Sequence, residues 1–256
     1  MANTSHSDKS AFEKAALRAP LIAKIERFVE LSGEERDCLQ RLQGEFTRYR
    51  DGSDIVAAGH RYRCLFVLNR GMAIRYKVLH DGRRHIINLN LPGDLLGFPG
   101  CLFDRSLYSI ASLGDVTVCP ITHEDLFVLF RRYPRLSTAL FWLVGHQAAV
   151  FAEHLVGVAR QSAYERIAHL LLELLVRLQA VGIADECSYF LPITQEQMAD
   201  ALGLSEPHVN RTLRRLREDG LIALEGAHVS CLDIATLSRV ADFNDAIFAR
   251  QQICGL

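Results

Sequence analysis

The sequence lacks an excess of charge of either sign. Among its 256 residues, 29 lysines and arginines stand against 30 aspartates and glutamates, and the formal net charge is -1. A chain with this balance has no globally basic surface, so any surface for nucleic acid must be local. Hydrophobic residues make up 49% of the chain and charged residues 23%. This ordinary composition and length predict two packed domains rather than a disordered or fibrous chain.

Long apolar runs are also missing. The first residues, MANTSHSDKSAFEK, contain no apolar segment of the signal-peptide type, and no uninterrupted apolar run is long enough to cross a bilayer. These absences predict a cytoplasmic protein without a membrane partner.

The cysteines are not clustered. Seven of them are spread along the chain, and no C-x-x-C pair occurs. This pattern favours reduced thiols, most of them small core residues. A redox switch formed by Cys101 and Cys119 is weighed against two buried thiols, and the second interpretation is favoured.

Signatures of catalysis are absent as well. The sequence has no Ser-His-Asp signature, P-loop or G-x-G-x-x-G motif, and it lacks the His-x-His pair of a cupin-type metal enzyme. We therefore expect no enzyme and no metal site. His60, His80 and His85 fall in predicted turns, but nothing distinguishes one of them as a haem ligand, and surface histidines are favoured.

The first half of the chain predicts two short helices followed by an antiparallel sheet. Residues 21–42 have apolar residues at helical spacing, and Ser32 and Glu35 form a capping box within them. From Phe46 to about Thr122 the pattern changes to short runs rich in Val, Ile, Leu and Tyr. Turn signals divide these runs at Asp51-Gly52, Asn69-Arg70-Gly71, Asp81-Gly82, Pro92-Gly93-Asp94 and Gly114-Asp115. Strands at this spacing without helices between them predict a small sandwich or barrel.

Helical spacing then returns. A short helix over 123–132 should end at Tyr133-Pro134, because the residue before proline disfavours the helical conformation. A long helix should follow from Arg135 to about Ala159. A coiled-coil seam is predicted on it by residues at alternating spacings of three and four, namely Leu140, Leu143, Gln147, Val150, His154 and Gly157.

A second stripe widens the apolar face of this helix, with Leu136, Phe151, Leu155 and Val158. A helix that is apolar on two sides needs two partners. We assign one side to the β domain and the other to a second subunit, with Leu140, Leu143, Gln147, Val150 and His154 at the dimer interface. The alternative is one wide stripe packed on the chain's own core.

A second domain begins near residue 160. Ser162 and Glu165 form a capping box that opens a helix with a core face of Ile167, Leu170, Leu171, Leu174 and Leu178. After a polar loop from Gly182 to Ser188, residues 193–226 read ITQEQMADALGLSEPHVNRTLRRLREDGLIALEG, which predicts two short helices and a hairpin.

The two short helices have the spacing of a helix-turn-helix motif. Thr194 and Gln197 cap the first helix, Gly203 permits the turn, and Ser205 should cap the second helix. Pro207 falls in the first turn of the second helix, where a missing N–H is harmless. The face with Val209, Leu213 and Leu216 should be buried, and Leu221 to Val229 should form a two-stranded wing that turns at Glu225-Gly226.

The outward face of the second helix is rich in arginine. Such a helix enters the major groove of DNA, so double-stranded DNA is the expected partner. The predicted DNA-contacting residues are Thr194, Ser205, Glu206, Pro207, His208, Asn210, Arg211, Arg214, Arg215 and Arg217.

This order of parts resembles the Crp/Fnr family of bacterial transcription regulators. The resemblance lies in the β region with PGDLLGF (residues 92–98), the long helix, and ITQEQMADALGLS with VNRTLRRLREDGLI. It implies an α+β fold with an antiparallel β-roll, a dimerisation helix and a winged helix-turn-helix. The resulting boundaries are 1–20 for an N-terminal extension, 21–125 for the sensor domain, 126–160 for the helical linker and dimerisation helix, 161–245 for the DNA-binding domain and 246–256 for a tail.

The same resemblance implies a homodimer that binds a two-fold symmetric promoter site, acts with RNA polymerase and responds to an effector or redox signal in the β-roll. In the usual recognition helix, a glutamate and an arginine contact base edges. Arg211 stands at the arginine position, whereas Pro207 stands at the glutamate position. The alternative function is a nucleotide-binding module that acts on a protein partner without DNA, which would leave the arginines of residues 211–217 unexplained.

The regulatory signal expected for this sequence differs from the signals of two well-known branches of the family. In members that bind cyclic AMP, a glutamate follows the Gly-Asp-x-x-Gly turn, but Phe98 stands there in this sequence. Cyclic AMP is therefore disfavoured, and another anion remains open. An iron–sulfur cluster is rejected because no cysteine precedes Cys38. The candidate pocket for an unknown effector consists of Gly93, Asp94, Gly97, Phe98, Arg105 and Ser106.

Overall fold

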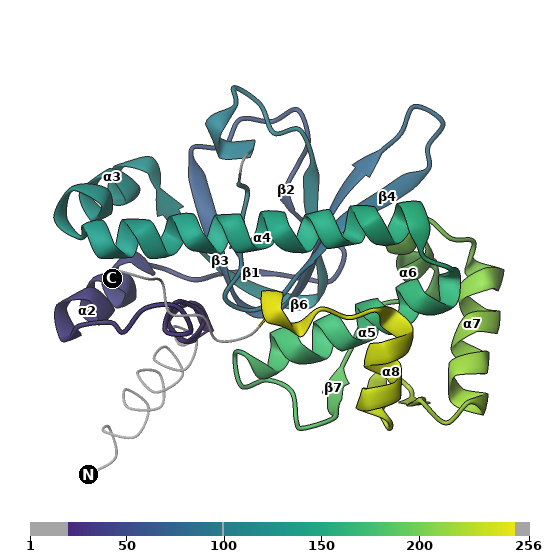
Figure 1. Cartoon of the computed structure of the whole chain (residues 1–256). Helices are drawn as coiled ribbons and strands as arrows, with labels where there is room; N and C mark the ends of the chain where they lie inside the picture. The colour runs from purple at the N-terminus through teal and green to yellow at the C-terminus, as the bar shows by residue number, and fades with distance from the viewer. Residues whose placement is uncertain (1–19, 99, 249–256) are drawn as a thin grey trace, which may run out of the picture.

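The computed structural model describes residues 20–98 and 100–248 (Figure 1). Almost all of the predicted N-terminal extension and most of the predicted tail therefore lie outside the described residues. The first described residues, 20–25, are helical, and α2 (Gly33–Leu42) follows. The Ser32 hydroxyl accepts a hydrogen bond from the Glu35 backbone N–H, and the Glu35 carboxylate accepts one from the Ser32 N–H. The predicted capping box is confirmed.

The middle of the chain forms the predicted antiparallel β-roll. Its strands are β1 (Thr47–Tyr49), β2 (Asp54–Val56), β3 (Cys64–Val78), β4 (Arg84–Asn90), β5 (Leu95–Leu96) and β6 (Ser109–Thr122), with a short 3-10 helix η1 (Gly100–Leu102). The order in the sheet is β1-β6-β3-β4, with β2 paired to β6 and β5 paired to β3. The long strands β3 and β6 pair with each other and form the centre of the roll.

Two of the predicted turns are wrong, because the strands run through them. Asn69-Arg70-Gly71 lies inside β3, and Gly114-Asp115 lies inside β6. The pairing of the two strands shifts register on both sides of Arg70. Gly71 has a φ of 82°, and a Cβ there would lie 2.5 Å from the Asp115 carbonyl oxygen. These glycines mark a bulge rather than a reversal of the chain.

Three consecutive helices follow the roll, α3 (His123–Arg132), α4 (Pro134–Arg160) and α5 (Ala163–Gln179). As predicted, α3 ends at Tyr133. In Figure 1, α4 crosses the width of the molecule in front of the strands. One side of α4 packs with Leu21, Ile25 and Phe28 of the N-terminal segment, in a core cluster that also contains Leu129 of α3.

The C-terminal part is a helical domain with a small sheet. It contains β7 (Ser188–Phe190), α6 (Gln195–Leu202), α7 (Glu206–Glu218), β8 (Ile222–Glu225), β9 (His228–Cys231), α8 (Ile234–Ala241) and the short 3-10 helix η2 (Asp245–Ile247). The wing turns at Gly226 as predicted, with a φ of 62°. The strand β7, which pairs with β9, and the helix α8, which packs on α5, were not predicted.

The core of this C-terminal part continues into the β-roll. Fully buried side chains of α5, among them Ile167, Leu171 and Leu174, belong to one cluster with Ile86 and Leu89 of β4. The two parts are therefore packed together through apolar side chains, and a change at this junction acts on both.

Candidate functional site

The helix-turn-helix is held by the contacts that the sequence predicts. The Thr194 hydroxyl accepts a hydrogen bond of 3.1 Å from the Gln197 N–H, and the Gln197 side chain accepts one of 2.9 Å from the Thr194 N–H. Gly203 ends α6 with a φ of 64°, in the left-handed region that favours glycine. The Leu204 N–H then donates to the Ala199 carbonyl over 3.0 Å.

The start of α7 differs from the prediction in one respect. Ser205 occupies the N-cap position with an extended backbone, but its side chain makes no capping hydrogen bond. Pro207, in the first turn, lacks one of the N–H groups that would otherwise remain without a partner. The Ser205 side chain is exposed at the end of the helix.

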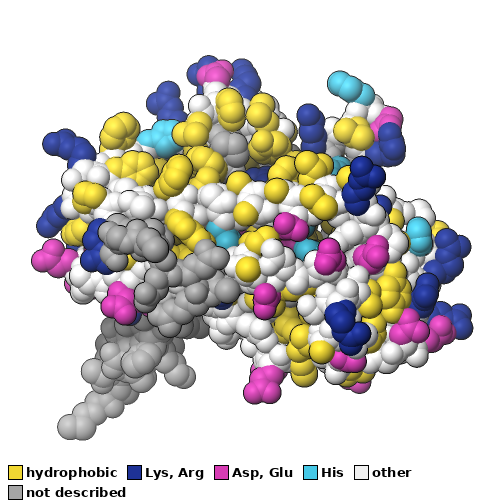
Figure 2. Space-filling model, in the orientation of Figure 1, with side chains coloured by type: hydrophobic (Ala, Val, Ile, Leu, Met, Phe, Trp, Pro, Cys, Tyr) yellow, Lys and Arg dark blue, Asp and Glu magenta, His cyan; other side chains and the backbone are white. Residues whose placement is uncertain are grey.

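The two faces of α7 are as different as predicted. Val209, Leu213 and Leu216 are buried in the C-terminal core. The exposed residues include every predicted DNA-contacting position on this helix, namely Glu206, Pro207, His208, Asn210, Arg211, Arg214, Arg215 and Arg217. The helix lies at the edge of the molecule (Figure 1), and basic side chains gather there in Figure 2.

The exposed arginines of α7 differ in how strongly they are bound to their neighbours. Arg214 pairs with Glu218 at 2.8 Å, and Arg215 lies over the Tyr164 ring at 4.9 Å. Arg211 has no ion-pair partner within residues 20–98 and 100–248, and a side chain without such a partner is free to contact a base or a phosphate. Asn210 donates to Gln195 of α6 over 2.9 Å.

The predicted dimer seam of α4 is wrong, because its apolar residues are buried within the same chain. Leu140, Leu143 and Val150 are 7%, 4% and 5% exposed. Gln147 lines a small hollow beside Lys24, and His154 binds Glu173 of α5. None of these contacts leaves the five predicted residues as a free surface.

A different stripe of α4 is exposed and has the same spacing. Its members alternate at three and four residues, and they are Thr138, Phe141, Gly145, Ala148, Ala152, Leu155 and Ala159. Phe141 is 77% exposed and Leu155 is 64% exposed. Figure 2 shows apolar side chains along this helix. We call this set the outer stripe.

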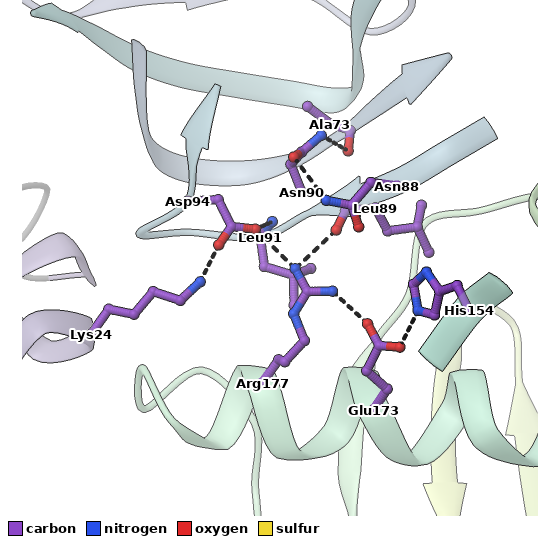
Figure 3. A network of polar contacts seen from close by, with 10 residues as sticks. All are labelled: Lys24, Ala73, Asn88, Leu89, Asn90, Leu91, Asp94, His154, Glu173 and Arg177. Atoms are coloured by element: carbon purple, nitrogen blue, oxygen red, sulfur yellow. Dashed lines mark hydrogen bonds and ion pairs between the residues drawn. The ribbon is translucent and has the colours of Figure 1, made fainter. Parts of the chain in front are cut away.

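A series of buried ion pairs joins the β-roll to the C-terminal part (Figure 3). Arg177 of α5 donates to Asp94 in the Pro92-Gly93-Asp94 turn over 2.9 Å, and to Glu173 over 2.6 Å. Lys24 also donates to Asp94, and His154 of α4 pairs with Glu173. The side chains of Asp94 and Glu173 are fully buried.

The groups in this series of ion pairs stabilise one another's charged forms. Burial raises the pKa of Glu173, but His154 and Arg177 outweigh this effect and lower it to about 2. Burial likewise raises the pKa of Asp94, while Lys24 and Arg177 bring it below its ordinary value. Burial lowers the pKa of Arg177, and the two carboxylates more than reverse that effect. Both acids are therefore ionised at neutral pH, as buried carboxylates are when paired.

The predicted effector pocket does not assemble around its six residues. Asp94 is committed to Lys24 and Arg177, and Gly93 packs so closely that a Cβ there would lie 2.7 Å from the Pro20 carbonyl oxygen. Arg105 extends at the surface and donates to the Gly59 carbonyl over 2.8 Å. Asp94 and Gly93 are therefore corrected from ligand contacts to structural residues.

The remaining members of that set also have internal partners. The Ser106 hydroxyl donates a hydrogen bond of 2.8 Å to the Tyr108 carbonyl, and Ser106 is buried. The Phe98 carbonyl accepts a hydrogen bond of 3.2 Å from Arg75, and the Gly97 carbonyl accepts one from the Cys101 N–H. These contacts stabilise the loop itself.

A small, partly open hollow lies where the β-roll meets the C-terminal part. Its lining includes Ile86, Leu89, His154, Gly157, His169 and Leu202, from β4, α4, α5 and α6. Neither ring nitrogen of the buried His169 makes a hydrogen bond of normal geometry within the described part of the chain, although the Ala241 carbonyl lies near it. Burial lowers the pKa of His169, so its ring is neutral.

Lys24, Glu173 and Arg177 belong to this network but were not predicted from the sequence. Glu173 and Arg177 stand one helical turn apart within the strongly apolar face of α5, LLLELLVRL, and charges inside such a run are a signal of buried pairing. Their partners in the β-roll and in the N-terminal segment lie far away in the sequence and have no local signal.

Two families of domains match this chain. The model of the cyclic nucleotide-binding domain matches residues 46–133, and that of the Crp-like helix-turn-helix domain matches residues 165–240. The matches correspond to the β-roll with α3 and to the C-terminal part from α5 to α8.

Whole proteins of the same organisation are similar as well. The nitrogen fixation regulation protein FixK of Bradyrhizobium diazoefficiens is 34% identical over 172 residues, which cover 67% of this chain and 71% of that protein. The transcriptional activatory protein AadR of Rhodopseudomonas palustris is 30% identical over 208 residues, which cover 80% and 84%. The solved structure of FixK2 from Bradyrhizobium japonicum, 23% identical, has the same fold with a TM-score of 0.69, over 77% of this chain and 96% of that one.

Proposed function

Because the chain belongs to the Crp/Fnr family and is a DNA-binding transcription regulator, we propose that two copies bind a two-fold symmetric DNA site together. Each copy inserts α7 into the major groove, with Arg211 on a guanine edge. The observation that carries this proposal is the contrast on α7 between a buried apolar face and an exposed face, on which Arg211 has no ion-pair partner among the described residues.

The other contacts follow from position along α7. His208 and Asn210 lie near Arg211 and discriminate the neighbouring base pair, while Thr194, Ser205 and Glu206 lie at the ends of the helices that approach the backbone. Pro207 cannot accept a hydrogen bond from cytosine, so the half-site differs there from the usual family sequence. Arg214 and Arg217 contact phosphates, and Arg215 mainly supports α7 through its contact with Tyr164.

We propose that the outer stripe of α4 forms the dimer interface. An apolar helix face of this length is costly to expose to water, and a second copy of the same stripe would cover it. Gly145, Ala148 and Ala152 are small, which lets two helices approach closely. By length and composition alone α4 would also suit a membrane. However, it packs one side on its own chain and carries His146 and Glu153, which favours a subunit interface.

We infer that the dimer acts on transcription by RNA polymerase in the cytoplasm, as expected for a relative of a transcriptional activator. No catalytic step is proposed, because the relatives are regulators rather than enzymes.

We propose that an effector molecule binds in the hollow where the β-roll meets the C-terminal part. A small, largely apolar molecule with one polar group fits its lining and would hydrogen-bond to the neutral His169 ring. Such a ligand would contact β4, α4, α5 and α6 at once, and so change how the DNA-binding part sits on the β-roll. Ala201 of α6 also lines the hollow. Filling the hollow with Ala201→Phe should therefore abolish any dependence of DNA binding on cell extract, while Arg105→Ala should leave that dependence intact.

The proposed function is tested by selecting bound sequences from random DNA with the purified full chain, with and without cell extract. We expect a two-fold symmetric site with half-sites about 34 Å apart, one helical turn. Recovery of no preferred DNA under either condition, together with capture of a protein from the extract, would support the alternative of a regulatory module without DNA binding.

A further inference from the structure

Two cysteines stand opposite each other in the sheet of the DNA-binding domain. β7 and β9 pair antiparallel, with Ser188 opposite Ser230 and Tyr189 opposite Val229. The same register continued by one residue places Cys187 opposite Cys231. A hydrogen bond of 2.8 Å from the Cys231 N–H to the Cys187 carbonyl shows that the pairing does continue.

The geometry of this pair suits a disulfide. Directly opposite residues of a hydrogen-bonded antiparallel pair have Cα atoms about 5.5 Å apart, and disulfides most often span about 5.5–6 Å between Cα atoms. Side chains of opposite residues also point to the same face of a sheet. On this face Tyr189, Val229 and Cys231 are buried, while Cys187 stands at the open end and is exposed.

The exposures of the two thiols give them different roles. Cys187 is accessible to a reagent from solvent, whereas Cys231 is 1% exposed and is shielded from such a reagent. Burial raises the pKa of Cys231 to about 11, and the neighbouring Cys187 contributes to the rise. Cys231 therefore stays a thiol until its neighbour is modified.

We propose that Cys187 and Cys231 are a redox-active pair that low-molecular-weight disulfides convert to an intramolecular disulfide. The Cys187 thiolate attacks oxidised glutathione, forms a mixed disulfide and releases one reduced glutathione. The Cys231 sulfur then loses its proton, attacks the Cys187 sulfur of the mixed disulfide and releases the second reduced glutathione. The two protein thiols are oxidised by two electrons, and the glutathione disulfide is reduced. The bond fixes the residue directly before β7 to the end of the wing strand β9.

The test uses the reduced full chain under native conditions, treated with oxidised glutathione and then with an alkylating reagent. Trypsin releases Cys187 in residues 178–211 and Cys231 in residues 218–239, and each peptide has a single cysteine. We expect these two peptides to be recovered linked, two hydrogens lighter than their sum, and separated again by dithiothreitol. A fully formed mixed disulfide on Cys187 beside an unreacted Cys231 would overturn the proposal.

Matched variants test the register itself. Cys187→Ser alters an exposed side chain, so it should leave the fold intact and abolish the linked peptides. Adding Ser188→Cys to that variant moves the thiol by one residue to the opposite face of the strand, and at least a tenfold lower yield of linkage to Cys231 is expected. An equal yield from the shifted cysteine would show that proximity in the native sheet does not determine the reaction. Cys101→Ala, in the β-roll, should leave the linkage unchanged.

Discussion

Arg177 Nη2 lies 2.9 Å from Asp94 Oδ2, and this contact joins α5 of the DNA-binding part to the turn between β4 and β5 of the β-roll. Both side chains are buried, and each has a further charged partner, Glu173 for Arg177 and Lys24 for Asp94. The contact thus places the DNA-binding part relative to the β-roll through charges that cannot be solvated individually.

Replacing Arg177 by Met should destabilise the protein strongly. The change leaves two buried carboxylates with one cationic partner fewer each, and breaking such a pair costs about 3 kcal/mol or more. The free energy of unfolding in urea measures this loss. Arg84→Met is the matched control, because the Arg84–Asp200 pair at 2.7 Å also joins the β-roll to the helix-turn-helix but is partly exposed. It should cost less than about 1 kcal/mol. Equally small losses in the free energy of unfolding for both variants would contradict the stabilising role of the buried ion pairs.

Acid should weaken the fold through His146. Burial, with Lys24 as the next cause, lowers the pKa of His146 from 6.5 to about 4 in the folded chain. The unfolded chain then binds more protons between these values, so stability is complete above pH 6.5 and falls as the pH drops toward 4. We expect a loss of about 2 kcal/mol over this window, allowing for the partial exposure of the ring.

The variant His146→Gln tests this origin, because its amide can still donate to the Ile247 carbonyl that His146 contacts at 2.9 Å. Unfolding measured across the same pH range should show a shallower dependence for this variant. His208→Gln changes an exposed side chain and should retain the wild-type slope. A slope that is the same in all three proteins would assign the acid sensitivity to other groups.

Leu155→Glu should separate the subunits without unfolding them. Leu155 belongs to the outer stripe and is 64% exposed in the single chain, so a charge there is tolerated until a second helix covers it. Analytical ultracentrifugation should show a monomer with unchanged circular dichroism. Leu143→Glu should instead unfold the chain, because Leu143 is buried in it. A dimer that persists in Leu155→Glu would exclude the outer stripe as the interface.

Cyclic AMP should not bind. Phe98 offers no carboxylate to the ribose hydroxyls, and Ser106 already donates to the Tyr108 carbonyl. Isothermal titration calorimetry with the full chain should give no heat of binding at micromolar nucleotide. Micromolar binding that disappears in Arg105→Ala would show that the β-roll loop rearranges around the nucleotide.

Local patterns were sufficient to predict most elements of the fold. Capping boxes at Ser32, Ser162 and Thr194 are encoded within four residues, and each is present in the structure. The faces of α7 follow directly from helical periodicity. β7 was missed because only three residues pair there, and their partner strand is distant in the sequence.

The predicted dimer seam failed for a different reason. On α4 the predicted seam, which begins at Leu140, and the outer stripe, which begins at Thr138, both alternate at spacings of three and four. Periodicity cannot distinguish which of them faces the chain's own core, since that depends on where the N-terminal helices pack. Periodicity also could not identify the partners of Asp94, because Lys24 and Arg177 lie 70 and 83 residues away from it in the sequence.

The most direct test of base recognition by α7 is binding-site selection with the wild-type protein, Arg211→Ala and Arg217→Ala. Both arginines are exposed on α7, but only Arg211 is assigned to a base. Arg211→Ala should lose about 1–3 kcal/mol on the preferred site and lose its preference at one base pair of each half-site. Arg217→Ala should keep the preferred sequence, weaken binding to all sequences alike and reduce the salt dependence. If Arg211→Ala selected the wild-type sequence at every position, α7 would not read DNA through this residue, and the central assignment would be wrong.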